Sequence, residues 1–291
     1  MMQMPTSSFD KISPTALIMA YARQFTDIPY SQELAQLVNA QAFVERLQKQ
    51  QSDKSFEIAV LFEGRYKAIN QMIAQFRTTQ IIELASGLLP RGMVMSQDPG
   101  IVFIESDLPA MISSKQQLVK QLVGDRSNLH FIATDATSQP SQFPLDVDYL
   151  DSLTPITVIS EGLLLYLTLN QKQHVFTNVR ELLQVYGGVW ITPDLMTKED
   201  LSRIRGTSPA LQKFSQTVRV MTGTSDKDTI FDNLDQVRQF TSEQGFQLQA
   251  YSMLNVLDQL TCLEPLGINP AVAESILTDS FVFAFTLMPS F

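Results

Sequence analysis

Acidic side chains follow several short apolar runs of this sequence, each at the point where the run ends. Glu83 closes the run 80–85, Glu105 and Asp107 end the next one, Asp135 follows the third, and Glu161 follows the fourth. The carboxyl ends of parallel strands meet at one edge of a sheet, where α/β proteins bind ligands. The sequence therefore predicts a row of carboxylates along one edge of a parallel sheet.

The turn after the first apolar run indicates the kind of ligand. It contains only Gly87 and Gly92, too few glycines for the G-x-G-x-x-G turn that binds a dinucleotide pyrophosphate. Carboxylates accept hydrogen bonds from ribose hydroxyls and amino groups, attract a positively charged ligand and repel a diphosphate. S-adenosylmethionine has these properties, with a sulfonium, an ammonium and no diphosphate, and Gly87 would let the backbone approach its methionine part.

The elements that must position these residues follow a repeated strand-helix order. Strand-length apolar runs rich in β-branched or aromatic residues occupy 80–85, 100–105, 128–133, 155–160 and 187–192, with amphipathic helical segments between them. Continuous apolar strands indicate a parallel sheet that is covered on both faces. A short strand after Gly245 and the alternating run 279–289 extend the sheet, whereas residues 14–76 have only helical periodicity, including one helical run from Ser31.

Five segments, taken in this order, resemble the successive motifs of the class I S-adenosylmethionine-dependent methyltransferases. They are IIELASGLLPRG, VFIESDLPAMISSKQQL, NLHFIATDA, VISEGLLLYLT and GGVWITPDL. Within that group the chain most resembles the leucine carboxyl methyltransferase-like family, which includes O-methyltransferases linked to polyketide biosynthesis. E-x-D-L-P after the second strand and E-G-L-L-x-Y-L after the fourth are the specific parts, and the resemblance covers residues 58–195 best.

The resemblance implies an α/β architecture with the Rossmann-like methyltransferase fold. It consists of a mostly parallel seven-stranded sheet with helices on both faces, an N-terminal helical cap, and an inserted helical lid after strand five. The predicted parts are a cap at 1–77 and a cofactor-binding domain at 78–291, with the lid at 195–231, in one compact unit. The cap and the lid would cover the site and determine the substrate.

The resemblance also implies roles for individual residues. Those expected to bind the cofactor are Arg65, Glu83, Gly87, Asp107, Leu108, Asp135, Ala136 and Glu161. Asp107 would bind the ribose hydroxyls, Asp135 would lie by the adenine amino group, and Arg65 would hold the cofactor carboxylate. Glu161 and Tyr166 are the candidate catalytic residues, near the sulfonium and facing the methyl group. The first motif departs from the family pattern, because Pro90 precedes Arg91.

Several of these residues also have purely structural interpretations. Gly87 could only form a tight turn, Asp107 could cap the following helix, and Asp135 could close a Thr-rich turn. Arg91 could be a surface charge of a helix, and His174 is expected on the exposed side of an amphipathic helix. Glu161 is harder to explain in this way, since a carboxylate among apolar residues is costly without a partner.

Composition excludes several classes of function. The net charge of −9 and the isoelectric point near 4.7 argue against a nucleic-acid or anionic membrane surface. With two histidines and one cysteine, a zinc site of the usual kinds is not expected, and the cofactor prediction includes no metal. The N-terminal segment lacks the basic region and the apolar length of a signal peptide, so a cytoplasmic location is expected.

These observations predict transfer of a methyl group from S-adenosylmethionine, which leaves S-adenosylhomocysteine, to a carboxylate or hydroxyl of a small molecule or a peptide C-terminus. A carboxylate acceptor is ionised at neutral pH and needs no general base, whereas a hydroxyl would need Tyr166 or a carboxylate as the base. Two alternatives stay open: a dinucleotide-dependent oxidoreductase on a similar sheet, and a non-catalytic relative that binds the cofactor or a partner. The sequence does not predict an oligomeric state.

Overall fold

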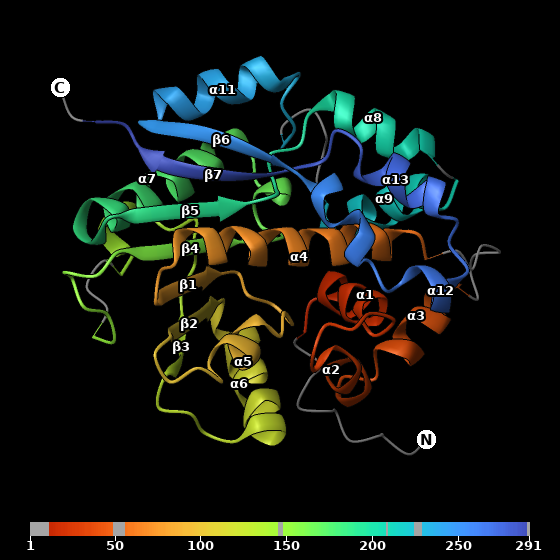
Figure 1. Cartoon of the computed structure of the whole chain (residues 1–291), viewed down its shortest axis with the longest axis horizontal. Helices are drawn as coiled ribbons and strands as arrows, with labels where there is room; N and C mark the ends of the chain where they lie inside the picture. Colours follow the sequence, from red (N-terminus) through yellow and green to blue (C-terminus); the bar gives the residue numbers. More distant parts are fainter. Residues whose placement is uncertain (1–11, 49–55, 145–147, 208, 224–228, 290–291) are drawn as a thin grey trace.

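The protein has a single seven-stranded sheet at its centre (Figure 1). The computed structural model describes residues 12–48, 56–144, 148–207, 209–223 and 229–289. Of the N-terminal segment that was compared with a signal peptide, residues 1–11 lie outside these ranges. The strands are β1 (Gln80–Leu84), β2 (Val102–Asp107), β3 (Leu129–Ala133), β4 (Ile156–Ser160), β5 (Gly188–Thr192), β6 (Phe246–Ser252) and β7 (Phe281–Leu287). Their order is β3-β2-β1-β4-β5-β7-β6, and only β7 runs antiparallel to its neighbours. The predicted mostly parallel sheet is confirmed.

Hydrophobic clusters lie on both faces of the sheet. Since successive strand residues point to opposite faces, each strand contributes side chains to both clusters. Ile81 and Ile82 show the alternation: the first packs into one hydrophobic cluster and the second into another. One cluster includes the helices α4 (Ile58–Phe76), α5 (Arg91–Met95), α6 (Pro109–Val123) and α13 (Pro270–Leu277), and the other includes α7 (Leu169–Tyr186) and α11 (Leu234–Glu243). This double coverage explains why the strands are continuously apolar.

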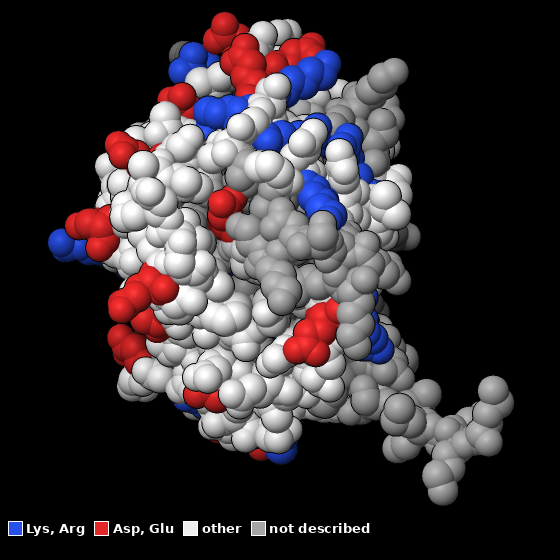
Figure 2. Space-filling view, turned by 90° about the vertical axis from the view of Figure 1, so that its right-hand side faces the viewer, with Lys and Arg blue, Asp and Glu red and all other residues white. Residues whose placement is uncertain are grey.

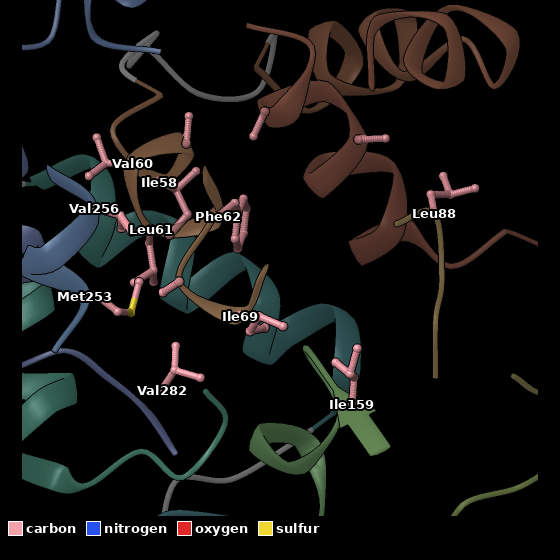
Figure 3. Packing of buried hydrophobic residues seen from close by; sticks show 14 of the residues in the cluster. Ile58, Val60, Leu61, Phe62, Ile69, Leu88, Ile159, Met253, Val256 and Val282 are labelled. Atoms are coloured by element: carbon pink, nitrogen blue, oxygen red, sulfur yellow. The ribbon is translucent and has the colours of Figure 1, made fainter. Parts of the chain in front are cut away.

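The long helix α4 joins the N-terminal helices to the sheet. Figure 3 shows its residues Ile58, Leu61, Phe62 and Ile69 in the same packed region as Ile159 of β4. α4 also contacts β5, β7, α13 and the 3₁₀ segment η3 (Met253–Gln259), which precedes the short α12 (Leu263–Leu266). The cluster that includes α4 therefore extends from the N-terminal helices into the sheet.

The remaining helices lie beyond the carboxyl ends of the parallel strands, on the side to which the β5 arrow points in Figure 1. They are α1 (Pro14–Arg23), α2 (Ser31–Leu37), α3 (Ala40–Gln48), α8 (Lys198–Thr207) and α9 (Pro209–Thr222). The expected single helical run from Ser31 is broken, because Asn39 has a φ of 52° and separates α2 from α3. α1 contacts both α4 and α9, so the N-terminal helices and the lid meet above the strand ends.

No helix in the described ranges has the length and apolar character needed to cross a membrane.

Candidate functional site

A cavity of about 330 Å³ opens at the carboxyl ends of β1, β2 and β4. We call it the rim cavity. Its wall includes the turn after β1, the tip of β2, the residues after β4 and one face of α1. The side chains and backbone of this wall include those of Thr15, Met19, Arg23, Gly87, Asp107, Leu108, Glu161 and Tyr166. The rim cavity lies where open α/β sheets bind their ligands.

The turn after β1 is held directly by Asp107. The Asp107 carboxylate accepts hydrogen bonds from the backbone N–H of Gly87 (2.8 Å) and of Leu108 (2.7 Å), so it joins the ends of β1 and β2. Gly87 has a φ of 48°, a conformation that side chains disfavour, and little lies near the place a Cβ would occupy. The N-cap residue of α6 is Leu108, so Asp107 does not cap that helix.

A buried network of charged side chains lies behind the rim cavity. Arg91 forms ion pairs with Glu83 and with Glu161 (Nη2 to Oε2, 2.9 Å), and its Nε donates to Asn70 (2.9 Å). Arg23 of α1 pairs with the other oxygen of Glu161 at 3.1 Å. Arg91 is completely buried, so the interpretation of it as a surface charge is wrong. Pro90, the departure in the first motif, is the N-cap residue of α5, where its missing N–H interrupts no hydrogen bond of the helix.

Glu105 has a separate partner. It is fully buried at the end of β2 and is ion-paired with Lys115 of α6, which also donates to the carbonyl of Ser86 at 3.2 Å. Burial raises the pKa of Glu105 to about 7, against the opposing effect of Lys115. Lys115 thus connects the turn after β1 to the end of β2.

These pairs correct the electrostatic expectation from the sequence. Three of the strand-end carboxylates, those of Glu83, Glu105 and Glu161, are buried and paired with arginine or lysine. They do not form a free negative edge that would attract a cation or repel a diphosphate. Of the five acids predicted at the strand ends, Asp107 and Asp135 are the two without an ion pair to another described residue.

Tyr166 lies between the rim cavity and a second cavity. This second cavity, of about 110 Å³, is lined mainly by α4, α8 and α9, and we call it the apolar cavity. Its lining includes Met19, Ile58, Leu61, Phe62, Arg65, Tyr166, Leu211 and Phe214. Met19 and Tyr166 are in both walls. The two cavities are therefore neighbours that meet at these two side chains.

The pKa values of the two candidate catalytic residues, Tyr166 and Glu161, do not favour either of them as a proton acceptor. Burial raises the pKa of Tyr166 to about 12, so its hydroxyl stays protonated at neutral pH. Burial would also raise the pKa of Glu161, but the guanidinium groups of Arg23 and Arg91 outweigh it and the pKa is lowered. Glu161 is therefore ionised and occupied by two arginines.

Arg65 is a buried guanidinium in the wall of the apolar cavity. Its side chain is about 95% buried, and within the described ranges it forms no hydrogen bond or ion pair. Its charge is close enough to oppose the effect of burial on the pKa of Asp194 and of Tyr166. A buried cation without a partner is costly, so Arg65 is suited to bind an anionic group of a ligand.

The loop that carries Tyr166 is fixed at both ends. Asp194, after β5, accepts hydrogen bonds from the backbone N–H groups of Gly162 (2.9 Å), Leu163 (2.7 Å) and Leu164 (3.1 Å). Lys172 of α7 donates to the carbonyl of Leu167 at 2.5 Å and to that of Thr229, at the end of the lid, at 2.6 Å. Tyr166 is thus held between two buried charged anchors.

We expect Asp194→Asn to lower the free energy of unfolding by about 2 kcal/mol, because hydrogen bonds to a buried charged acceptor are worth roughly 1.5–3 kcal/mol. Urea denaturation measures the loss. Asp125→Asn is the control, since the Asp125 side chain is 79% exposed and is paired only with Lys120. Equal stability of the two variants would show that Asp194 does not anchor this loop.

Five of the residues predicted from the sequence line the rim cavity: Gly87, Asp107, Leu108, Glu161 and Tyr166. Glu83 does not, because it is buried behind the cavity against Arg91. Arg65 lines the apolar cavity, and Asp135 and Ala136 lie in the loop after β3, outside both walls.

Sequence reasoning missed Arg23, Lys115 and Asp194. Arg23 is an isolated basic residue in a mainly apolar helical segment, a pattern that indicates a buried and paired charge, whereas Lys115 stands among polar residues and gives no such signal. Asp194 stands inside the last quoted motif, directly after an apolar strand, like the acids that were recognised.

Comparisons with known proteins place the chain in a family. A model of the leucine carboxyl methyltransferase family matches residues 13–180, more than half of the chain. A protein of Mycobacterium sp. (strain JLS), whose name assigns it provisionally to the S-adenosyl-L-methionine-dependent methyltransferases, is 26% identical over 186 residues. This alignment covers 59% of the chain and 62% of that relative.

Solved structures share the fold. A provisionally assigned methyltransferase from Thermobifida fusca YX is 15% identical, with a TM-score of 0.58 over 98% of this chain and 99% of that one. A DUF574 family protein from Streptomyces avermitilis MA-4680 is 13% identical, with a TM-score of 0.58 over 97% and 100%. At these identities the likeness concerns the fold alone, the Rossmann-like methyltransferase fold. Because the family model matches more than half of the chain, the chain belongs to the leucine carboxyl methyltransferase family.

Proposed function

We propose that the protein is an S-adenosylmethionine-dependent O-methyltransferase that binds its cofactor in the rim cavity and its acceptor in the apolar cavity. The observation that carries this proposal is the meeting of the two cavities at Met19 and Tyr166. A transfer between two ligands needs such neighbouring sites, with the reacting groups held in line.

The rim cavity has groups that suit the cofactor. The half-buried Asp107 can accept hydrogen bonds from both ribose hydroxyls, with Leu108 beside it. Gly87 leaves room for the methionine part, because little lies near its missing Cβ. Asp135 and Ala136, in the loop next to Asp107, would bind the adenine. When bound, S-adenosylmethionine supplies a methyl group on a positively charged sulfur.

Two arginines are candidates for the cofactor carboxylate. Arg65 was expected in this role, and it is buried and without an anionic partner in the described part of the chain, at the boundary marked by Tyr166. Arg23 lines the rim cavity directly, although it also pairs with Glu161. Glu161 would hold Arg23 in place and lie near the ammonium group, whereas Glu83, which is buried against Arg91 behind the cavity, would not contact the cofactor.

The protonation states favour an acceptor that is already ionised. Tyr166 keeps its proton at neutral pH, and Glu161 is occupied by Arg23 and Arg91, so neither is available as a general base. A carboxylate acceptor needs none. Tyr166 and Met19 would position the acceptor oxygen, and the apolar walls would exclude water from a reaction in which opposite charges are neutralised.

The lid adds a preference for negative charge. The predicted lid, residues 195–231, contains six basic and four acidic residues, in a chain with a net charge of −9. Figure 2 shows several basic side chains in the upper part of the face on which α8 and α9 lie, with acidic side chains at its top edge. This charge would attract an anionic acceptor toward the apolar cavity.

The size of the apolar cavity limits the part of the acceptor that enters it. Its volume of about 110 Å³ is somewhat below the roughly 150 Å³ of an engineered protein cavity that binds benzene. A single ring or a branched alkyl group next to the carboxylate would fill it. We therefore propose small apolar carboxylic acids, or a peptide that ends in one apolar residue, as the acceptor.

Ligand-dependent melting tests the cofactor site. S-adenosylhomocysteine at one hundred times its Kd should add about 2.7 kcal/mol to the free energy of unfolding, which raises Tm by several degrees. NAD at the same concentration should leave Tm unchanged, whereas stabilisation by NAD alone would favour an oxidoreductase. Absence of any effect from S-adenosylhomocysteine would refute the proposal.

A screen with methyl-labelled S-adenosylmethionine tests the reaction. The panel pairs small apolar carboxylic acids with the alcohols of the same carbon skeleton, and adds short peptides with apolar C-termini. We expect label in the acids or peptides and not in the matched alcohols. Label only in the alcohols would contradict the carboxylate proposal, and binding of the cofactor with no transfer to any compound would favour the non-catalytic alternative.

A further inference from the structure

The loop after β3, residues 134–138, is held by two side chains of α7. Nδ1 of His174 lies 3.0 Å from the carbonyl oxygen of Thr137, and Nδ2 of Asn178 donates to the carbonyls of Ala136 and Ser138, both at 3.0 Å. Because a carbonyl only accepts, Nδ1 of His174 must carry the proton in this contact. Two side chains one helical turn apart thus bind three successive carbonyl groups.

These contacts correct the expectation for His174 and give a role to Asn178. His174 is half-buried rather than exposed, and Asn178 is completely buried. A buried amide that binds two loop carbonyls is costly to remove, because both carbonyls would lose their partner. The loop conformation therefore depends on α7.

The same loop is joined to the rim cavity. The backbone N–H of Thr134 donates to the carbonyl of Asp107 at 2.9 Å, and Asp107 is in the wall of that cavity. Within the loop, Oδ1 of Asp135 accepts from both the backbone N–H and the hydroxyl of Thr137, each at 2.8 Å. The Asp135 carboxylate is thus fixed in direction through one of its two oxygens.

Two hydrogen-bonding groups of the loop remain available. In the part of the chain that the structure describes, nothing bonds to Oδ2 of Asp135 or to the backbone N–H of Ala136. One is an acceptor and the other a donor on neighbouring residues. Adenine presents the complementary pair, an amino donor beside a ring-nitrogen acceptor, whereas hypoxanthine presents a carbonyl and a ring N–H there.

We propose that His174 and Asn178 are positioning residues for base recognition, which hold the loop so that Asp135 and Ala136 select adenine. This inference rests on the proposed function, because it concerns the base of the same cofactor. Neither side chain lines the rim cavity, and each acts through the loop carbonyls. The same helix begins at Leu169, just after Tyr166. α7 would therefore connect the loop that binds the adenine with the residue proposed to face the methyl group.

The test compares two ligands by calorimetry: S-adenosylhomocysteine and S-inosylhomocysteine, in which the adenine amino group is replaced by oxygen. Wild-type protein should bind the adenine compound at least about tenfold more tightly. His174→Ala and Asn178→Ala should each weaken binding of the adenine compound, by roughly tenfold for Asn178→Ala, and should reduce the ratio of the two dissociation constants toward one.

The ratio separates positioning from a general structural role. Loss of affinity for both ligands by the same factor, with the ratio kept, would overturn the inference, and so would wild-type affinity in both variants. Gln173→Ala is the control, because Gln173 is exposed on the same helix and should leave both constants unchanged. If Asn178→Ala does not fold, the half-buried His174 supplies the test through His174→Ala alone.

A wild-type protein that binds both ligands without discrimination would overturn the inference and leave the proposed function standing. A wild-type protein that binds neither would overturn the proposed function as well.

Discussion

Replacement of Arg91 by Met should remove about 3–5 kcal/mol of the free energy of unfolding, the cost of leaving a buried charge without its partner. Arg91 is completely buried and pairs with both Glu83 and Glu161. Its guanidinium carbon also lies 4.6 Å from the centre of the Tyr66 ring. Met fills a similar volume but neutralises neither carboxylate, and Glu83 has no other ion pair in the described residues. Urea denaturation at neutral pH measures the change.

The double variant Arg91→Met with Glu83→Gln should regain part of this loss, because the carboxylate left without a partner is then removed. Arg238→Met is the matched control, since the Arg238 side chain is 61% exposed and its ion pair with Asp235 should contribute less than about 1 kcal/mol. If Arg91→Met were as stable as Arg238→Met, the buried network would not stabilise the fold in the way described.

Replacement of Asp107 by Ala should weaken binding of S-adenosylhomocysteine by roughly ten- to a hundredfold, since a charged hydrogen-bond acceptor is worth about 1.5–3 kcal/mol. Two effects combine. The ribose hydroxyls lose their acceptor, and the backbone N–H groups of Gly87 and Leu108 lose the carboxylate that joins β1 to β2. Titration calorimetry gives the dissociation constant.

Asp98→Ala is the control for this prediction. Asp98 is exposed, and its carboxylate also accepts from a backbone N–H, that of Gly100 at 2.8 Å, but it precedes β2 instead of following it. It should bind the ligand as the wild type does. Unchanged affinity in Asp107→Ala would exclude Asp107 from the cofactor site.

The sequence was sufficient to predict the sheet and its coverage, for local reasons. The five strands β1 to β5 are mainly apolar runs, and the burial of β1 and β4 on both faces explains this pattern, whereas β6 is half exposed and alternates with polar residues. The break between α2 and α3 was not predictable in the same way. It depends on the left-handed conformation of Asn39, within a run whose apolar spacing continues across the break.

The sequence predicted where the site lies, but it did not predict that most of its carboxylates are paired with cations. The sequence showed that Glu83, Glu105 and Glu161 follow strands, because that is a local property. Their cations come from other elements, such as Arg23 of α1, which is 138 residues from Glu161. The two pairs of Glu161, with Arg23 and with Arg91 at 70 residues, leave no local signal. The predicted negative edge is in fact a largely neutralised interior with Asp107 at its surface.

The N-terminal helices do more than cover the strand ends, because α1 lines both cavities. Arg23 of α1 contacts Glu161, and Met19 of α1 lines both cavities. α1 thus contributes to the rim cavity, to the apolar cavity and to the buried network behind them. The division into a cap at 1–77 and a cofactor domain at 78–291 remains a prediction, although one hydrophobic cluster includes residues of both.

The most direct test of this account is a crystal structure of the protein with S-adenosylhomocysteine bound. We predict that the ligand occupies the rim cavity, with its ribose hydroxyls within hydrogen-bonding distance of Asp107 and its sulfur directed toward Tyr166, where the apolar cavity begins. A ligand bound elsewhere, or with its sulfur directed away from Tyr166, would contradict the proposal that methyl transfer takes place between the two cavities.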